Sequence, residues 1–253
     1  MKGMFGRLVC GLLGGGLMGV ALHASPAVAL SEEDLLDKFA KVPVFVLVDS
    51  SGGYITPISD PPNDGLGNVA LLQVFFSEAD VVSFVEDIRT DNPRFNQGGS
   101  VGVVDLATVH RLAREDREIP LKLIFIPQED DFEAAVALDS EFGGAVSSSL
   151  VPLFALQDAS GNYLPLSVSR DSESSEAEEA ETIFSMFFSK QDADNVLNTL
   201  QQSNPDLSQV SVGVVSLADV SSDFLSTDND AFQMIQFLPD SEVINHIQGL
   251  DLE

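Results

Sequence analysis

Few residues of this chain have the type and spacing that chemistry requires. The stretch "DSSGG", Asp49 to Gly53, places a carboxylate beside two serine hydroxyls, a pairing that could serve nucleophilic catalysis. Such a pair needs a general base, and the two histidines beyond residue 29, His110 and His246, have no neighbours that indicate a triad or a metal site. The other interpretation of "DSSGG" is a turn, in which glycine supplies positive φ and the aspartate accepts hydrogen bonds from backbone amides.

Two acidic stretches could attract calcium. These are "EDDFE", Glu129 to Glu133, and "TDND", Thr227 to Asp230, but neither has the spacing or the glycine of an EF-hand loop. Glu129, Asp130 and Asp131 fit better as acids in the first turn of a helix, where the helix dipole favours them. There is also no phosphate-binding glycine loop. The sequence therefore predicts no catalytic residue, no cofactor, no metal and no enzyme activity, with a hydrolase of dispersed site as the alternative.

The N-terminus has the pattern of a secretory signal peptide over residues 1–29. Lys2 and Arg7 form a positive region, an apolar segment follows, and Ala27 and Ala29 are the small residues of a cleavage site. The apolar segment is shorter than the ~20 residues that a spanning helix needs, which disfavours the alternative of a membrane anchor. The sequence thus predicts an exported protein.

Charge narrows the range of partners. The whole chain has a formal net charge of −28, and loss of residues 1–29 would leave 224 residues with a charge of −30 and no cysteine. Such a surface repels nucleic acid and anionic lipid headgroups and favours basic partners. No later segment is long and apolar enough to span a bilayer. We therefore expect a soluble protein that binds no nucleic acid, does not insert stably into membranes, and holds together through its core without disulfides.

Four blocks of the chain occur twice in the same order. Such repetition at nearly constant spacing indicates an internal duplication, with a first repeat at 30–148 and a second at 149–253. The turn "DSSGG" returns as "DASGN", so an Asp–Ser site would have to exist twice, and this favours the turn of a β-hairpin. The paired blocks are "VPVFVLVDSSGGY" and "VPLFALQDASGNY", "VFFSEADVVSFVEDIRTDNP" and "MFFSKQDADNVLNTLQQSNP", "SVGVVDLATV" and "SVGVVSLADV", and "IFIPQEDDFEAAV" and "IQFLPDSEVINHI".

Each half is predicted to begin with the hairpin and to continue with alternating strands and helices. Ser77 and Ser189 are placed to cap the first helix of their halves, because Asp80 and Asp192 follow three residues later. Apolar residues recur at helical spacing behind these caps. The predicted fold class is α/β with mixed sheets, or alternatively α+β, in two duplicated halves related by a pseudo-twofold axis.

Two adjacent phenylalanines end a strand in each half. Side chains alternate along a strand, so Phe75 and Phe187 face one side of the sheet while Phe76 and Phe188 face the other. Burial of all four is favoured if helices cover both faces of the sheet. The alternative places Phe76 and Phe188 in a groove between the halves, and these two residues are the candidates for binding a client polypeptide.

The halves differ most after the hairpin. The first has the Pro/Gly-rich "SDPPNDGLGN", whereas the second has an acidic, serine-rich segment at 170–181. A run of charge is usually a solvated loop, and the alternative is a docking strip for a basic partner.

Together these motifs resemble the Tic22 family, which comprises a component of the translocon at the inner envelope of chloroplasts and its cyanobacterial relatives. The resemblance rests on the repeated "VPVF" hairpin with its aspartate and glycine, the "FFS" strand that leads into a capped helix ending at "NP", the "VGVVDL" strand–helix segment, and "IFIP". It covers the chain from about Leu30 to Leu252. The strong acidity and the 170–181 segment depart from the family pattern.

The resemblance implies a chaperone or escort that binds hydrophobic segments of precursor or outer-membrane proteins without ATP, near Omp85-type pores. It implies no catalytic residue. The expected location is the periplasm, with the thylakoid lumen as the alternative. A different function also remains open, that of a structural tether between membrane translocation complexes through an acidic surface.

Overall fold

The computed structural model describes most of the chain beyond the predicted signal peptide. The described residues are 31–59, 68–91, 99–140, 142, 150–168, 181–226 and 230–250. Four sequence predictions concern residues that lie wholly or largely outside these ranges: the signal peptide at 1–29, the Pro/Gly-rich segment at 59–68, the acidic segment at 170–181 and the "TDND" stretch at 227–230.

The first sheet is mixed. In it β1 pairs antiparallel with β3 and β4, β2 pairs antiparallel with the start of β3, and β5 pairs parallel with β3. The crossover from β3 to the parallel β5 carries α2, β4 and α3. The strands are β1 (Pro43–Val48), β2 (Ile58–Ser59), β3 (Val69–Phe75), β4 (Ser100–Asp105) and β5 (Leu121–Ile126).

The second sheet repeats this pairing strand for strand. Here β6 pairs antiparallel with β8 and β9, β7 pairs antiparallel with β8, and β10 pairs parallel with β8. Even the register agrees, since Phe45 lies opposite Phe75 and Phe154 lies opposite Phe187. The predicted mixed α/β fold is confirmed, while common origin and an exact twofold relation stay predictions. The strands are β6 (Pro152–Gln157), β7 (Leu166–Val168), β8 (Glu181–Phe187), β9 (Ser211–Ser216) and β10 (Ile235–Leu238).

The "DSSGG" and "DASGN" stretches are turns. Asp49 Oδ1 accepts hydrogen bonds from the backbone N–H of Ser51 at 2.8 Å and of Gly53 at 2.9 Å, and Gly52 has a φ of 84°. The Ser51 hydroxyl and these amides hold the pKa of Asp49 below its usual range. Asp158 makes the same backbone bonds in the second turn. The turn prediction is confirmed, although the return strand of each hairpin is reduced to a single bridge.

The predicted caps also form. The Ser77 hydroxyl accepts from the backbone N–H of Asp80 at 3.3 Å, and Ser189 accepts from Asp192 at 3.4 Å, so α2 and α5 begin where the sequence indicated. The helices are α1 (Glu32–Phe39), α2 (Glu78–Asp91), α3 (Leu106–Arg114), α4 (Glu129–Leu138), α5 (Lys190–Ser203), α6 (Leu217–Ser226) and α7 (Ser241–Leu250), with short 3-10 turns η3 (Pro205–Gln209) and η4 (Asp230–Met234).

The two sheets share one central core. Alternate residues of β1 and β3, such as Val44 and Val74, pack in one cluster with Leu153 and Met186 from the second sheet. Apolar faces of α1, α3 and α6 complete this cluster. Because the cluster contains residues of both halves, the inner face of each sheet is buried partly by the other half.

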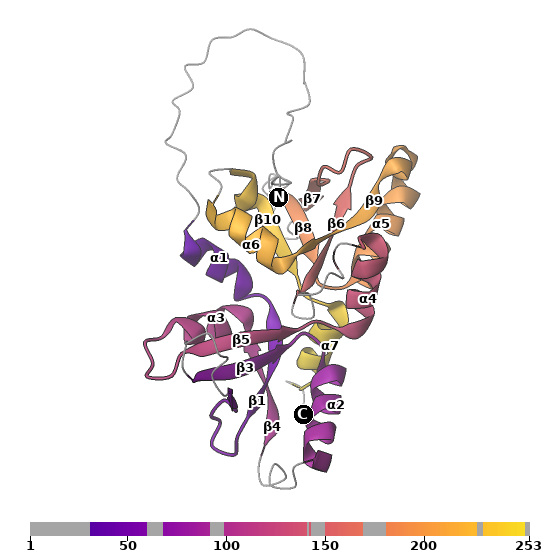
Figure 1. Ribbon diagram of the computed structural model, residues 1–253. Coiled ribbons are helices and arrows are strands. Elements are labelled where there is room, and N and C mark those ends of the chain that lie inside the picture. Colours follow the sequence, from indigo (N-terminus) through magenta and orange to yellow (C-terminus); the bar gives the residue numbers. More distant parts are fainter. Residues whose placement is uncertain are drawn as a thin grey trace, which may run out of the picture.

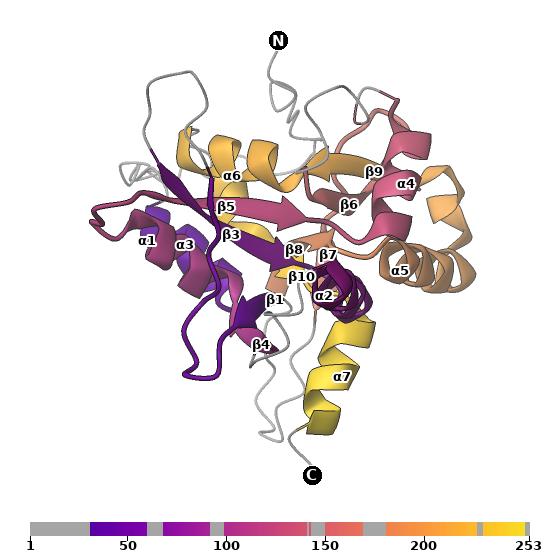
Figure 2. The same cartoon turned by 60° about the horizontal axis from the view of Figure 1, so that its bottom comes forward.

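The outer faces are covered by exchanged helices. In both views of the chain, α4 lies beside α5 over the second sheet, and α7 lies beside α2 over the first (Figures 1 and 2). Ala135 of α4 belongs to the cluster of Phe154 and Phe187, while Val243 of α7 belongs to the cluster of Phe45 and other residues of the first sheet. The last helix of each predicted repeat thus packs on the sheet of the other repeat.

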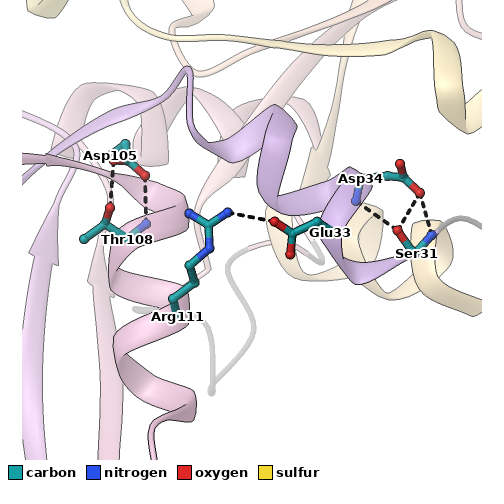
Figure 3. Close-up of polar contacts among 6 residues, drawn as sticks. All are labelled: Ser31, Glu33, Asp34, Asp105, Thr108 and Arg111. Carbon is teal, nitrogen blue, oxygen red and sulfur yellow. Dashed lines mark hydrogen bonds and ion pairs between the residues drawn. The ribbon is translucent and has the colours of Figure 1, made fainter.

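The N-terminal helix α1 joins both sheets. Ser31 and Asp34 form a capping box at its start, and Glu33 pairs with Arg111 of α3 at 3.2 Å (Figure 3). At its other end, Lys38 Nζ donates to the backbone oxygens of Gln233 and Ile235, both at 2.8 Å. One helix therefore contacts α3 of the first half and β10 of the second.

Candidate functional site at the junction of the two sheets

The two client-binding candidates meet at the centre of the molecule. The rings of Phe76 and Phe188 stack with centroids 5.2 Å apart and planes 14° apart. They are only 7% and 6% exposed, and Phe75 and Phe187 are buried in the outer clusters. The favoured prediction, burial of all four rings, is confirmed. Contact between Phe76 or Phe188 and a client stays a prediction.

Matched residues of the two repeats surround the stacked rings, and we call this set the junction. Four prolines at strand ends line it, and the cavity that remains is about 10 Å³, about the smallest that holds one water. The junction therefore has no room for a client in this arrangement. It comprises Val42, Pro43, Phe76, Pro127, Gln128 and Asp131 from the first half, and Val151, Pro152, Phe188, Pro239, Asp240 and Val243 from the second.

Carboxylates from one helix bind the N-terminus of another beside the junction. Asp131 of α4 accepts from the backbone N–H of Lys190 in α5 at 2.8 Å. Asp192 of α5 accepts from the backbone N–H of Ser241 at 2.8 Å and from its hydroxyl at 2.7 Å. Unpaired N–H groups and the helix dipole make each N-terminus attractive to an anion. These contacts fix α4 and α7 in their exchanged positions.

The same carboxylates are partly removed from water. Burial, with a smaller contribution from the nearby Asp240 and Asp130, raises the pKa of Asp131 to about 6, although the hydrogen bond from the Lys190 amide lowers it. Burial likewise raises the pKa of Asp240 and of Asp80. Asp80 accepts a bond from the backbone of Glu129, yet its Oδ2 is buried and has no partner among the described residues. Several acids of the junction region thus hold protons more tightly than free aspartate.

Next to the junction lies an open acidic cleft of about 510 Å³. Its walls are the first turns of α4, α5 and α7, so most lining side chains are acidic or amide groups. Its one lysine, Lys190, pairs with Asp194 at 2.5 Å. The cleft is lined by Gln128, Asp130, Asp131, Ala134, Ser189, Lys190, Gln191, Asp192, Asp194, Asn195, Asp240, Ser241 and Glu242. Its chemistry suits a positively charged partner.

The two histidines lie apart in the fold. His110 packs against Phe39 and Phe125 with ring centroids 5.1 and 5.9 Å away, and burial lowers its pKa. His246 of α7 pairs with Glu78 of α2 at 3.0 Å. Within the described ranges, no three His, Cys, Asp or Glu side chains are placed to hold a metal, and no helix could cross a bilayer.

Sequence reasoning identified Phe76 and Phe188 but missed the residues that surround them. The prolines Pro43, Pro127, Pro152 and Pro239 lie within matching blocks of the duplication, so their correspondence was visible in the sequence. Their approach to one place was not, because it depends on how the two sheets pack.

The fold and the junction define a mixed α/β protein of two matched five-stranded sheets with exchanged helices. The model of the Tic22-like family matches residues 18–155, more than half of the chain, and the chain belongs to this family. The resemblance seen in the sequence is thereby confirmed.

Solved structures share the fold. One described as "Anabaena Tic22 (protein transport)" is 19% identical with a TM-score of 0.70, and the match covers 87% of this chain and 97% of that one. Tic22 from Plasmodium falciparum is 14% identical with a TM-score of 0.63, covering 86% and 98%. The comparison with curated proteins gives no match.

Proposed function

We propose that this protein is an exported escort for polypeptides in protein transport, and that it binds apolar segments of precursor or outer-membrane proteins without ATP. The observation that carries this proposal is family membership, together with the fold shared with an Anabaena protein described by the words "protein transport". Binding an unfolded segment requires apolar contact area, which contributes about 25 cal/mol per Å² buried. It requires no reactive group.

Two features of the structure support this function. Among the residues that the structure describes, five large aliphatic side chains are at least 40% exposed, namely Ile58, Val82, Val103, Leu138 and Leu225. The high negative charge would keep a loaded complex soluble through repulsion between complexes. The Phe76–Phe188 stack would become a further apolar surface only if the two sheets moved apart.

The first test is suppression of aggregation. The protein without residues 1–29 is added to an outer-membrane protein diluted out of urea, and light scattering is followed. We expect scattering to fall in proportion to the escort added, without nucleotide, because apolar client segments become covered. A matched acidic control, serum albumin at equal mass, should have a much smaller effect. Undiminished scattering at several-fold excess would contradict the proposal.

The proposed location is the periplasm, with the thylakoid lumen as the alternative. The signal-peptide pattern at 1–29 supports export. Fractionation of cells that carry a C-terminally tagged copy distinguishes the two compartments, and recovery in the cytoplasm would contradict export.

The acidic cleft favours a second candidate, a tether that binds a folded, basic surface. Contacts between charges weaken with salt, because the screening length falls from about 10 Å at 0.1 M to about 3 Å at 1 M. A tether should therefore release its partner as sodium chloride rises over this range, measured by surface plasmon resonance. Retention of an unfolded client at 1 M salt would instead favour the apolar escort.

A further inference from the structure

Strand β4 ends the first sheet, and its pairing with β1 shows which backbone groups point outward. In an antiparallel pair, residues that exchange hydrogen bonds alternate with residues that do not. The N–H of Leu106 donates to the Val42 oxygen at 2.8 Å, and Pro43, which has no N–H, lies opposite Asp105. These contacts fix the phase of the ladder.

This phase shows that the backbone N–H and C=O groups of successive β4 residues point alternately toward β1 and away from it. Ser100, Gly102 and Val104 direct their N–H and C=O groups toward β1. Val101 and Val103 direct theirs away, and β4 has no second strand partner within the described residues. The outer edge of β4 thus offers two N–H and two C=O groups in the spacing of a strand.

Two other edges of the sheets carry a lysine, a common protection against unwanted pairing. At the start of β10, Lys38 of α1 donates to the oxygen of Ile235 and to that of Gln233, which precedes the strand. On β5, the exposed Lys122 lies within the strand. Strand β4 contains no lysine and no proline.

The matching strand β9 is more enclosed than β4. Helices α4 and α5 pack over it, and Val212 and Val214 are half-buried in their cluster. Val103, which corresponds to Val214 in the repeat, is 40% exposed beside the open edge. A strand added to β4 would cover this side chain as well as pair with the backbone.

We propose that the outer edge of β4 binds an extended segment of a client polypeptide, which joins the first sheet as an additional strand. This inference rests on the proposed escort function and names the surface that would perform it. Backbone pairing is independent of the client's sequence, and the exposed Val103 favours an apolar residue opposite it.

The charge of the chain selects among occupants of this edge. Two copies of a chain with a net charge of −28 repel each other, which disfavours β4-to-β4 pairing. A client with basic residues flanking its apolar ones is attracted by the same charge. The occupant is therefore a client segment with mixed apolar and basic side chains.

The test uses the protein without residues 1–29 and a short fluorescein-labelled peptide in which valine and lysine alternate. Val103→Pro removes one outward N–H while leaving the bonds to β1 in place, and proline is tolerated at strand edges. Val103→Lys adds the charge found on the protected edges. Val82→Lys, which changes an exposed valine of α2 in the same way, is the control. We expect both Val103 variants to raise the Kd about tenfold or more and the control to stay within about twofold of wild type.

Several outcomes would overturn the assignment. One is a Val103→Lys variant that binds the peptide as tightly as the wild type. This variant alone decides the test if circular dichroism shows that Val103→Pro is unfolded. Others are an equal loss in Val82→Lys and no binding of the peptide to the wild type. Wild-type dimers in sedimentation that Val103→Lys abolishes would show that a second copy occupies the edge.

The aggregation assay separates the edge from the escort function. If aggregation is suppressed equally by wild type and Val103 variants, the proposed role of the edge is wrong while the escort function stands. If the wild type binds peptide but suppresses no aggregation, the function fails instead.

Discussion

Replacing Phe188 with alanine lowers the free energy of unfolding by about 3–5 kcal/mol, and Phe76→Ala has an effect of similar size. Each ring is buried in the central cluster, so truncation removes apolar contact and leaves a cavity. The two rings also stack, with centroids 5.2 Å apart. The double variant should therefore lose less than the sum of the single losses, by about 0.5–1.5 kcal/mol. Urea unfolding followed by circular dichroism measures all three values.

The controls separate packing from client contact. Ile58→Ala removes a side chain that is mostly exposed and should change stability by less than about 0.5 kcal/mol. Phe188→Leu keeps most of the buried volume, so it should stay folded and keep its escort activity. If Phe188→Leu or Phe188→Ala left stability almost unchanged but abolished client binding, the rings would be accessible in solution and would contact the client directly.

The sequence could predict those features that depend on a few neighbouring residues. The Asp49 turn needs only an aspartate, a glycine with positive φ and the amides between them, all within five residues. The caps at Ser77 and Ser189 are equally local. Repetition strengthened each of these predictions, because two copies of a motif test one interpretation twice.

The exchange of α4 and α7 could not be predicted in the same way. Helical periodicity shows which face of α4 is apolar, but the apolar faces of the two sheets are nearly identical in composition. A helix that follows β5 can therefore bury its face on either sheet, and the choice depends on the chain beyond it. For the same reason the boundary at 148–149, which marks the repeats in the sequence, does not separate two independent packing units. The boundary as a limit of domains stays a prediction.

The junction carboxylates illustrate the same limit at the level of one residue. The sequence placed Asp131 in the first turn of a helix, stabilised by the dipole of that helix, and it does lie in the first turn of α4. Its hydrogen bond, however, goes to the N-terminus of α5, 59 residues away. Sequence spacing identified the helix position and could not identify the second helix.

Asp131→Asn is expected to raise the free energy of unfolding by about 1–2 kcal/mol near pH 7.5 and to have a much smaller effect near pH 4.5, where the folded protein holds the proton. The residue Asp131 is 7% exposed, and its pKa is raised to about 6 in the folded protein, against about 3.9 in an unfolded chain. Each unit corresponds to about 1.4 kcal/mol, and the adjoining open cleft reduces the full value. Asparagine has no charge to desolvate, and its oxygen can still accept from Lys190.

The sign follows from proton binding. Between pH 6 and 4 the folded protein holds a proton on Asp131 that the unfolded chain has released, so this group stabilises the fold as the pH falls. Asp80 and Asp240 act in the same direction. Asp49 and Asp158 have the opposite effect. Their pKa values are lowered in the folded protein, so the stability that they contribute near neutral pH is lost as the pH falls into stronger acid.

The wild type should therefore be most stable in mildly acidic buffer, near pH 5, and the Asn variant should show a flatter profile from pH 5 to 8. Thermal and urea unfolding across this range measure both curves. Asp87→Asn, on the exposed side of α2, removes the same charge without changing burial and should leave the shape of the profile unchanged. An Asp131→Asn protein less stable than wild type at pH 7.5 would mean that the charge itself holds α4 to α5. The N-terminus of α5 would then attract the carboxylate more strongly than burial and the neighbouring acids disfavour it.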